Sequence, residues 1–246
     1  FSDTRGLNDA GQVIGLSLRA DGTQERGATA WSWTSDGGTV RLGYVDAAHT
    51  STNGSRTSRP VAVNNRGSVI GYSFRHESGD IGRTAWVADK FGALTRLGYT
   101  DAIHTSPNGT QFSDPLAINQ SGQVVGHSTR YSASFSQTAW LWREGSGMQR
   151  IGLTDSEHTL QSSQAQFGEV RLQNEANQVM GISDRYSASG RNGFSAWMWT
   201  ESGGTMRMGL TDSRHTNSSG RKESTPLAMN ENGQAIGIST RYPNSG

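Results

Sequence analysis

Four Asp–His pairs recur at the same spacing along this chain, and their side chains are the ones best suited to chemistry. Each pair lies in a nine-residue motif that resembles Leu-Gly-x-x-Asp-x-x-His-Thr, and four of the six histidines belong to it. Imidazole and carboxylate groups are good zinc ligands, but one of each leaves a site short of the three or four protein ligands that zinc usually has. The pairs are Asp46/His49, Asp101/His104, Asp155/His158 and Asp212/His215.

A buried hydrogen-bond network is the alternative role for these pairs, and we favour it. A group that is present in every repeat can serve simply to hold the repeats together. We therefore predict an inter-repeat structural role, with no metal and no cofactor, for the eight Asp and His residues. The same role is predicted for one tryptophan in each repeat: Trp31, Trp86, Trp140 and Trp197.

Arginine and tyrosine recur at the end of the segment that we expect to form the second strand of each repeat. They are the candidate ligand-binding residues. The guanidinium groups could bind an anionic ligand such as an acidic sugar, or could instead pair with the motif aspartates. The tyrosines open loops rich in Ser, Gly and Asn, a composition typical of adaptable binding surfaces, or they could cap the hydrophobic layer. The predicted set is Arg75, Arg130, Arg185, Arg241, Tyr131, Tyr186 and Tyr242.

Catalysis would require a set of groups that occurs only once, because one reaction centre needs one constellation. The residues that break the repeat are His76 with Glu77, His127, Asp184 and the linker 160–169. None of them forms a recognisable nucleophile–base pair, and no serine-hydrolase or zinc-protease motif is present. We therefore predict no catalytic residue.

Composition excludes several classes of partner. The net charge is +1 and there is no run of Lys or Arg, so nucleic acid is not an expected partner. No apolar run approaches 18 residues, so no membrane span is expected. Cysteine is absent, which excludes disulfides and thiolate chemistry.

The spacing of the motif indicates a repeat of about 55 residues, since its aspartates lie at 46, 101, 155 and 212. Each repeat reads as four short strands joined by Gly-rich turns, and no helical periodicity is visible. This pattern predicts an all-β fold, a β-propeller of four-stranded blades, with a β-solenoid as the alternative. We expect one domain, 1–246, with five blades of which the last is incomplete. The repeats run over 1–56, 57–111, 112–166, 167–223 and 224–246.

Local patterns fix further expectations within a repeat. The proline in segments such as Pro115-Leu116-Ala117 is expected at the first residue of a strand. In Asn119-Gln120-Ser121-Gly122 the Asn and the Gly are both expected at positive φ. The connections between the second and third strands are expected to be long loops, on the same face as the Asp–His linkers. These long loops are 20–27, 76–82, 131–136 and 186–194.

The order of these segments resembles the HAF repeat of secreted or surface-anchored bacterial proteins. The resemblance lies in an Ala-Thr-Ala-Trp-Ser-Trp strand, a Gly-Gly turn and the hairpin Val63-Asn64-Asn65-Arg66-Gly67-Ser68-Val69. Here tryptophan replaces the family's phenylalanine, and the Asp–His motif replaces its usual Leu-Gly-Thr-Leu-Gly-Gly. The resemblance implies a propeller-like repeat and an extracellular or cell-envelope location, and it implies no general chemistry.

These observations favour a non-enzymatic extracellular β-propeller that binds a glycan or a protein through its long-loop face. Two alternatives stay open. One is a polysaccharide-active lyase or hydrolase with a single site at the channel mouth. The other is a purely structural module of a larger surface protein, in which further segments of its own longer chain would be partners.

Overall fold

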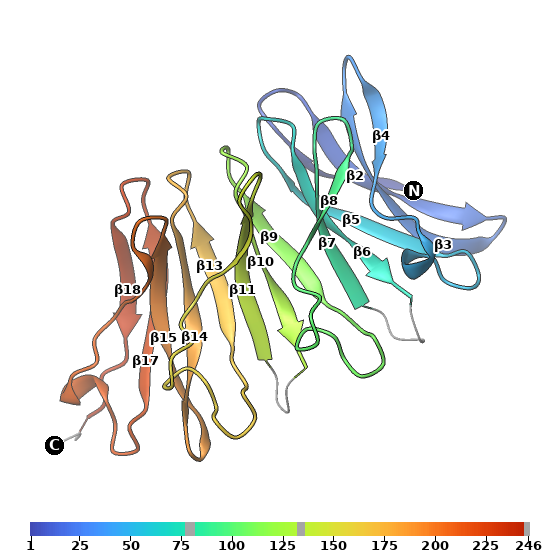
Figure 1. Cartoon of the computed structure of the whole chain (residues 1–246). Coiled ribbons are helices and arrows are strands. Elements are labelled where there is room, and N and C mark those ends of the chain that lie inside the picture. The colour runs from blue at the N-terminus through green and yellow to red at the C-terminus, as the bar shows by residue number, and fades with distance from the viewer. Residues whose placement is uncertain (77–81, 132–135, 244–246) are drawn as a thin grey trace. The chain divides into compact units, whose positions relative to one another are not determined.

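The computed structural model describes residues 1–76, 82–131 and 136–243. The chain divides into two compact units. The first comprises Phe1–Ser128 and Trp142–Met148, and the second comprises Thr129–Leu141 and Gln149–Gly246. Strands dominate both, and the only helical elements among the described residues are two 3-10 turns, η1 (Ala47–His49) and η2 (Ser213–His215). The fold is therefore all-β (Figure 1).

The first unit contains two complete four-stranded repeats. In each repeat, successive strands pair antiparallel. Strands β9 and β10 follow as a third antiparallel pair. The strands are β1 (Ser2–Leu7), β2 (Val13–Asp21), β3 (Gln24–Thr34), β4 (Gly38–Leu42), β5 (Arg56–Val63), β6 (Val69–Arg75), β7 (Gly82–Ala88), β8 (Leu94–Leu97), β9 (Ser113–Ile118) and β10 (Val124–Arg130).

The second unit contains one further complete repeat and a two-stranded one. Strands β13 to β16 pair in the same antiparallel order, and β17 pairs with β18. Strands β10, β11 and β12 of the third repeat are divided between the units. The strands are β11 (Ser136–Arg143), β12 (Gly147–Arg150), β13 (Gly168–Gln173), β14 (Val179–Ser187), β15 (Gly190–Thr200), β16 (Gly204–Arg207), β17 (Lys222–Met229) and β18 (Ala235–Ser239).

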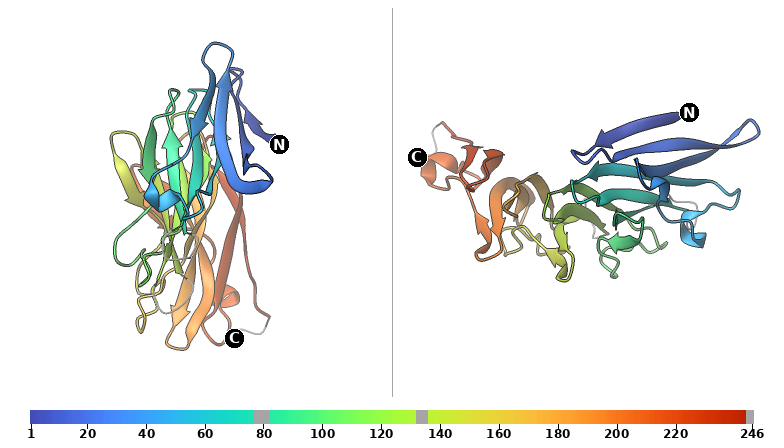
Figure 2. Two further views of the ribbon diagram at one scale, coloured as in Figure 1. Left: turned by 90° about the vertical axis from the view of Figure 1, so that its right-hand side faces the viewer. Right: turned by 90° about the horizontal axis from the view of Figure 1, so that it is seen from above.

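Four antiparallel strands in sequence order form the blade of a β-propeller, so the predicted fold class is confirmed at this level. Within a repeat the strands form a twisted sheet, which Figure 2 shows from two further sides. Neighbouring repeats are joined where a third strand meets the next first strand in parallel, as at Gly27 with Arg56 and Gly193 with Lys222. The number of blades, the single domain and the repeat boundaries stay predictions.

Every first strand whose pairing is described contains one extra residue. The register shifts once in β1, β5, β9, β13 and β17. In β5, Pro60 is the fifth residue and lies next to this bulge, with the extra residue Val61 exposed. The prediction that the proline begins the strand is therefore wrong. A bulge tolerates proline because the ladder is locally interrupted there.

The turn between the first and second strands also differs from expectation. Gly67 and Gly122 have positive φ, whereas Asn64 and Asn119 do not. The Asn64 side chain instead accepts hydrogen bonds from the N–H groups of Arg66 and Ser68, at 3.1 and 3.0 Å. Its amide closes the turn by bonding to the backbone, as Asn commonly does in turns.

Two of the four predicted long loops are extended hairpins. Strand β2 continues to Asp21 and β3 begins at Gln24, so segment 20–27 holds only a two-residue turn at Gly22. Strands β14 and β15 enclose a similar two-residue turn within segment 186–194. In both segments the second and third strands stay paired almost to the turn. The prediction of long loops at these two places is therefore wrong. The other two loops, 76–82 and 131–136, lie partly outside the described residues.

The apolar core of the first unit lies between its first two repeats. Trp86 of β7 is fully buried against Ile14, Ala30 and Leu42 of the first repeat. Its ring crosses Gly71 of β6, where any Cβ would overlap the indole. The small residues of the second strand therefore make room for the tryptophan of the third strand.

Candidate functional site

The Asp–His motif folds as a small turn that is closed by its own side chains. In the first repeat the Asp46 carboxylate accepts hydrogen bonds from the His49 backbone N–H at 3.1 Å and from the His49 ring Nδ1 at 2.6 Å. The hydroxyl of Thr50 donates to the Val45 carbonyl at 3.2 Å. The ring contact recurs in the other repeats at 2.7, 2.6 and 2.8 Å. The motif thus supplies its own N-cap and its own closing bond.

The far side of the histidine ring contacts the next repeat. His49 Nε2 lies 2.8 Å from the hydroxyl of Thr84, in the third strand of the second repeat. His158 Nε2 lies 3.0 Å from the hydroxyl of Ser195, in the third strand of the fourth repeat. A carboxylate can only accept, so Nδ1 carries a hydrogen, and in the neutral form of the ring Nε2 accepts from the hydroxyl. The ring therefore bridges two repeats through both of its nitrogens.

His104 of the second repeat shows where the predicted buried network has to be corrected. Its side chain is buried, with 6% exposed, whereas the side chain of its partner Asp101 is 57% exposed. The His104 ring contacts Asp101 through Nδ1 at 2.7 Å and stacks on Tyr99, with the ring centroids 5.0 Å apart. The pair is thus not buried as a whole, because the histidine lies inside and the aspartate faces solvent. These contacts lie within one linker, so the inter-repeat role of His104 stays a prediction.

Burial is consistent with the neutral state of the bridging rings. It lowers the pKa of His49 and of His158 below the usual value, although the hydrogen-bonded aspartate in each pair opposes the shift. Partial burial acts to raise the pKa of Asp46, but hydrogen bonds from the His49 ring and from backbone N–H groups outweigh it, so this pKa is lowered. Among the described residues, no three His, Asp or Glu side chains gather as a metal site would require.

Three of the predicted ligand-binding arginines are buried, namely Arg75, Arg130 and Arg185. Arg185 forms a bidentate pair with Glu157 at 2.7 and 3.2 Å. Arg130 donates to the Gln164 carbonyl at 3.2 Å. These contacts tie the second strand to the neighbouring linker. Arg241 is exposed.

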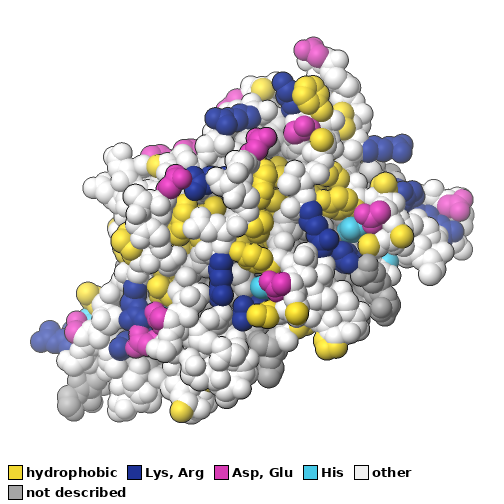
Figure 3. Space-filling model, viewed as in Figure 1, with side chains coloured by type: hydrophobic (Ala, Val, Ile, Leu, Met, Phe, Trp, Pro, Cys, Tyr) yellow, Lys and Arg dark blue, Asp and Glu magenta, His cyan; other side chains and the backbone are white. Residues whose placement is uncertain are grey.

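A second set of recurring arginines lies next to the Asp–His motif. They are not among the predicted residues, although their spacing is regular. One arginine stands two residues before the motif glycine in each repeat: Arg41, Arg96, Arg150 and Arg207. Arg96 donates to the Gln111 side chain at 2.7 Å, and Arg207 pairs with Glu157. Figure 3 shows His side chains beside acidic ones, with basic side chains close by. The recurrence of these arginines could have been read from the repeat alignment alone.

The predicted tyrosines are partly buried. The Tyr186 N–H donates to the Glu157 carbonyl at 2.8 Å, so this residue secures the linker through its backbone. Burial, together with nearby Asp184, raises the pKa of the Tyr186 phenol to about 12. The Tyr242 hydroxyl donates to Glu223 at 3.2 Å. Residues 132–135, which follow Tyr131, lie outside the described residues.

One cluster of the first unit contains two residues that do not recur in the other repeats, Arg83 and His127. Arg83 pairs with Asp114 at 2.8 Å, and His127 Nε2 lies 3.7 Å from the same carboxylate. The Arg83 guanidinium also lies over the rings of Tyr72 and Phe112, at 5.2 and 5.5 Å from their centroids. His127, a residue that breaks the repeat, thus lies in an ion-pair and aromatic cluster.

A pocket of about 200 Å³ lies within the first unit. It lies at the short turns of the second and third repeats, not at the long loops. Trp142 lines it and is only partly buried, whereas its counterpart in the fourth repeat, Trp199, is 2% exposed. The residues that the second repeat contributes are mostly small: Ser68, Val87, Ala88, Ala93 and Thr95.

Three charged side chains surround this Trp142 pocket. The Arg66 guanidinium donates to the Ser121 carbonyl at 3.1 Å and stays exposed. Asp89 Oδ1 accepts from the N–H groups of Phe91 and Ala93, at 2.8 and 2.9 Å, which fixes the carboxylate at the rim. Glu144 makes no hydrogen bond or ion pair with the described residues. The pocket therefore combines an indole wall with one fixed and one free carboxylate.

The fold and this pocket define a class: an all-β protein of propeller-type blades with a concave, tryptophan-lined site. The chain belongs to the family described as "Protein of unknown function (DUF3466)", whose sequence model matches residues 2–144. No curated protein matches the chain. No described helix is long and apolar enough to cross a membrane.

Solved structures resemble the chain distantly. One is a mutant lectin of Aleuria aurantia bound to Fucα1-6GlcNAc, with a TM-score of 0.34 and 10% identity, covering 85% of this chain. Another comes from the GH130 family of mannoside phosphorylases, which contains glycoside hydrolases that target β-1,2-mannosidic linkages in Candida mannan. It has a TM-score of 0.30 and 12% identity, covering 80% of this chain and 66% of that one. The chain spans 60% of the length of the lectin. Likenesses this distant leave the function to be argued from the chain's own residues.

Proposed function

We propose that this chain is a non-enzymatic glycan-binding protein and that the Trp142 pocket holds one sugar ring. The observation that carries the proposal is the partly exposed Trp142 indole in a concave site that also holds two carboxylates and a guanidinium group. We also propose an extracellular or cell-envelope location, as the HAF-repeat resemblance implies.

The chemistry of a sugar matches these groups. One face of a pyranose ring presents C–H bonds, which pack well on an aromatic ring such as that of Trp142. The hydroxyl groups at the ring edge need hydrogen-bond partners, and Asp89 and Glu144 are acceptors for them. Ligand sites generally combine an apolar wall with a few such fixed polar groups.

The charge of the pocket selects among sugars. Two carboxylates face a single guanidinium group, so the lining is net negative. A uronic or sialic acid would bring a further negative charge toward Asp89 and Glu144. The proposed ligand is therefore a neutral hexose or an N-acetylhexosamine.

Binding to a glycan array, before and after substitution, tests this site. Trp142→Ala should reduce binding by at least about tenfold, the effect of removing a central aromatic anchor. The matched control is Trp33→Ala, which removes the equivalent indole of the first repeat, 42% exposed and outside the described pockets. Binding that survives Trp142→Ala and is lost in the control would exclude the pocket as the site.

The long-loop face supplies the competing location. Tyr186→Ala tests it, because this tyrosine opens one of the predicted loops and is partly buried in the structure. If Tyr186→Ala abolishes glycan binding while Trp142→Ala does not, the ligand binds at the long loops. Unchanged binding in both variants would exclude both locations as the site, whereas a wild-type chain that binds no glycan would favour a purely structural module.

Glycoside hydrolysis is a second candidate, because two carboxylates line the same pocket. Most glycosidases use such a pair on either side of the scissile bond. Glu144→Gln would then abolish release of reducing sugar from any glycan that the chain binds. A wild-type chain that binds a glycan without releasing sugar would exclude hydrolysis of that glycan.

A further inference from the structure

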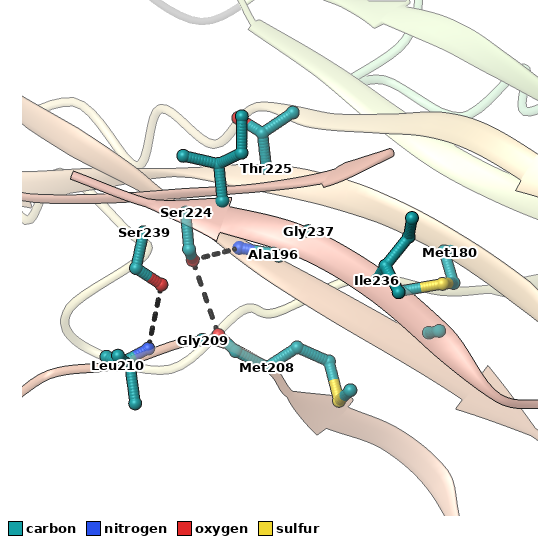
Figure 4. A pocket seen from close by; sticks show the side chains of 12 residues that line it. Met180, Ala196, Met208, Gly209, Leu210, Ser224, Thr225, Ile236, Gly237 and Ser239 are labelled. Carbon is teal, nitrogen blue, oxygen red and sulfur yellow. Dashed lines mark hydrogen bonds between the residues drawn. The ribbon is translucent and has the colours of Figure 1, made fainter. Parts of the chain in front are cut away.

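The outer face of the last described hairpin carries a groove where every complete repeat carries a tryptophan. Strand β18 pairs with β17 alone among the described strands. A groove of about 290 Å³ lies beside it, lined by Met180, Ala196 and Met208 of the fourth repeat and by residues of β18 (Figure 4). Ile236 and Met180 lie at one end, and Leu210 and Ser239 lie at the other.

The same surface is filled in the first unit. There the corresponding residues are Ile14, Ala30 and Leu42, and Trp86 of β7 packs on them with no exposure. Trp86 stands opposite Gly71 in the ladder, as Trp197 stands opposite Gly181. At Gly237 of β18 an added Cβ would meet only β17 backbone atoms and no indole.

Exposure shows how much apolar surface is left uncovered. Ile70 of β6 is fully buried, whereas its counterpart in β18, Ile236, is 67% exposed. Ile238 and Leu210 are exposed as well. Adjacent exposed apolar side chains on an unpaired strand edge indicate an interaction surface.

The hydrogen bonds around the groove repeat those of the filled site. The Ser73 hydroxyl accepts from the Tyr44 N–H at 3.0 Å and from the Trp86 indole N–H at 3.1 Å. Ser239 accepts the equivalent backbone bond from Leu210 at 2.9 Å. The indole donor of Trp86 has no counterpart at Ser239 among the described residues. In the fourth repeat the Trp197 indole N–H makes no hydrogen bond with the described residues, so this bond is formed in some filled sites and not in others.

His215 indicates one more feature of a partner that would fill the groove. Its Nδ1 contacts Asp212 at 2.8 Å, as in the other repeats. Its Nε2 has no partner among the described residues, whereas His49 and His158 meet a Thr or Ser hydroxyl there. That hydroxyl belongs to the residue two positions before the tryptophan, in the sequences Thr84-Ala85-Trp86 and Ser195-Ala196-Trp197.

We propose that the β18 groove binds an antiparallel β-strand that carries the sequence Ser/Thr-Ala-Trp. Its tryptophan would lie over Gly237 and donate to Ser239, its alanine would pair with Ile238, and its hydroxyl would reach His215. This continues an interface that the described chain already forms in β6 with β7 and in β14 with β15. Backbone pairing supplies affinity in such strand addition, and the side-chain pocket supplies specificity.

A fluorescein-labelled peptide with the sequence of residues 190–207 tests the proposal by anisotropy titration with the whole chain. We expect saturable binding that weakens at least about tenfold when the peptide's Ser-Ala-Trp is changed to Ser-Ala-Ala. Ile236→Asp in the chain should abolish binding, because it places a charge in the groove. Phe91→Asp is the matched control, since Phe91 is 77% exposed and lies far along the chain in the other unit.

A second experiment tethers the peptide to the chain through a disulfide. It detects binding that is too weak to measure with the free peptide. The chain has no cysteine, so Thr240→Cys gives one attachment point for a peptide that ends in cysteine. Disulfide formation should be at least about tenfold faster with the tryptophan peptide than with its alanine variant. Equal rates, or titrations that Ile236→Asp leaves unchanged, overturn the proposal. The proposal is also overturned if the peptide does not bind and the chain forms a dimer that Ile236→Asp dissociates. The occupant of the groove would then be a second copy of the chain.

Discussion

His158 Nε2 lies 3.0 Å from Ser195 Oγ, and this contact joins the linker of the third repeat to the third strand of the fourth. The ring is fully buried, and its other nitrogen contacts Asp155 at 2.6 Å. Both ring nitrogens are therefore used inside the protein. His158 thus connects the third repeat to the fourth through hydrogen bonds.

Removing the His158 side chain should lower the stability of the fold. We expect His158→Ala to reduce the free energy of unfolding by about 1–3 kcal/mol, because it leaves buried polar partners unsatisfied. Urea denaturation followed by tryptophan fluorescence measures the change. A metal chelator should leave the wild-type midpoint where it is; a lower midpoint would instead support the metal-site alternative.

His215→Ala is the matched control for His158→Ala. Its ring keeps the aspartate contact but meets no third strand among the described residues. The loss of stability should therefore be smaller than for His158→Ala. Equal losses would show that the Asp–His contact, and not the bridge to the next repeat, carries the effect.

A line of asparagines at the first turn of each repeat forms a second connection. The Asn8 amide donates to the Asn64 carbonyl at 2.8 Å, and Asn64 donates to the Asn119 carbonyl at 3.0 Å. Asn64 is 1% exposed, so its loss removes the acceptor of the turn N–H groups and one of the two hydrogen bonds to the Asn119 carbonyl. We expect Asn64→Ala to cost about 1–3 kcal/mol in chemical denaturation.

Asn230→Ala provides the comparison for Asn64→Ala. Asn230 caps its own turn through Asn232 and Gln234, but it is exposed and donates to no further turn among the described residues. Its replacement should cost clearly less. A cost as large as that of Asn64→Ala would assign the effect to the turn itself and not to the connection between repeats.

The strand pattern was readable from the sequence because it depends on local alternation, turn glycines and a repeat that shows each signal several times. The turn chemistry was not. Asn64 and Gly67 look equally suited to positive φ, and only the neighbouring turn decides that Asn64 serves as a donor between repeats. The bulge at Pro60 depends on pairing with β6, which no single strand reveals.

The Trp142 pocket lay beyond sequence reasoning for a related reason. Trp142 and Trp199 occupy the same position in their repeats, so the sequence treats them alike. Their exposure differs because the pocket depends on small side chains about 55–75 residues earlier in the chain, such as Ser68 and Ala88. A one-dimensional pattern does not show which side chains face each other across two repeats.

Asn177 offers a test of a conformation that the other repeats assign to glycine. It has φ of 63°, where the second and third repeats have Gly67 and Gly122. Asn177→Gly should leave stability unchanged or slightly higher, whereas Asn177→Ala should lower it by about 1–2 kcal/mol, the cost of a left-handed Ala. Thermal unfolding of both variants measures the difference, and equal melting temperatures would contradict this reading of the turn.

Glu157 makes the stability of the second unit depend on acid pH. Hydrogen bonds from Arg185, and then from Arg207, lower the pKa of this carboxyl from 4.5 to about 2, although burial acts in the opposite direction. A depressed folded-state pKa means that the unfolded chain binds the proton more readily. The stabilisation is therefore fully present above pH 4.5 and is lost as the pH falls from 4.5 toward 2.

Glu157→Gln should accordingly flatten the decline of stability between pH 4.5 and about 2, while lowering stability at pH 7. Urea midpoints measured across this range give the comparison. Glu144→Gln serves as the control, because Glu144 is exposed and has no ion pair with the described residues, so its profile should follow the wild type. If Glu157→Gln declines in acid as steeply as the wild type, then Arg185 and Arg207 do not hold this carboxylate in solution as they do in the structure.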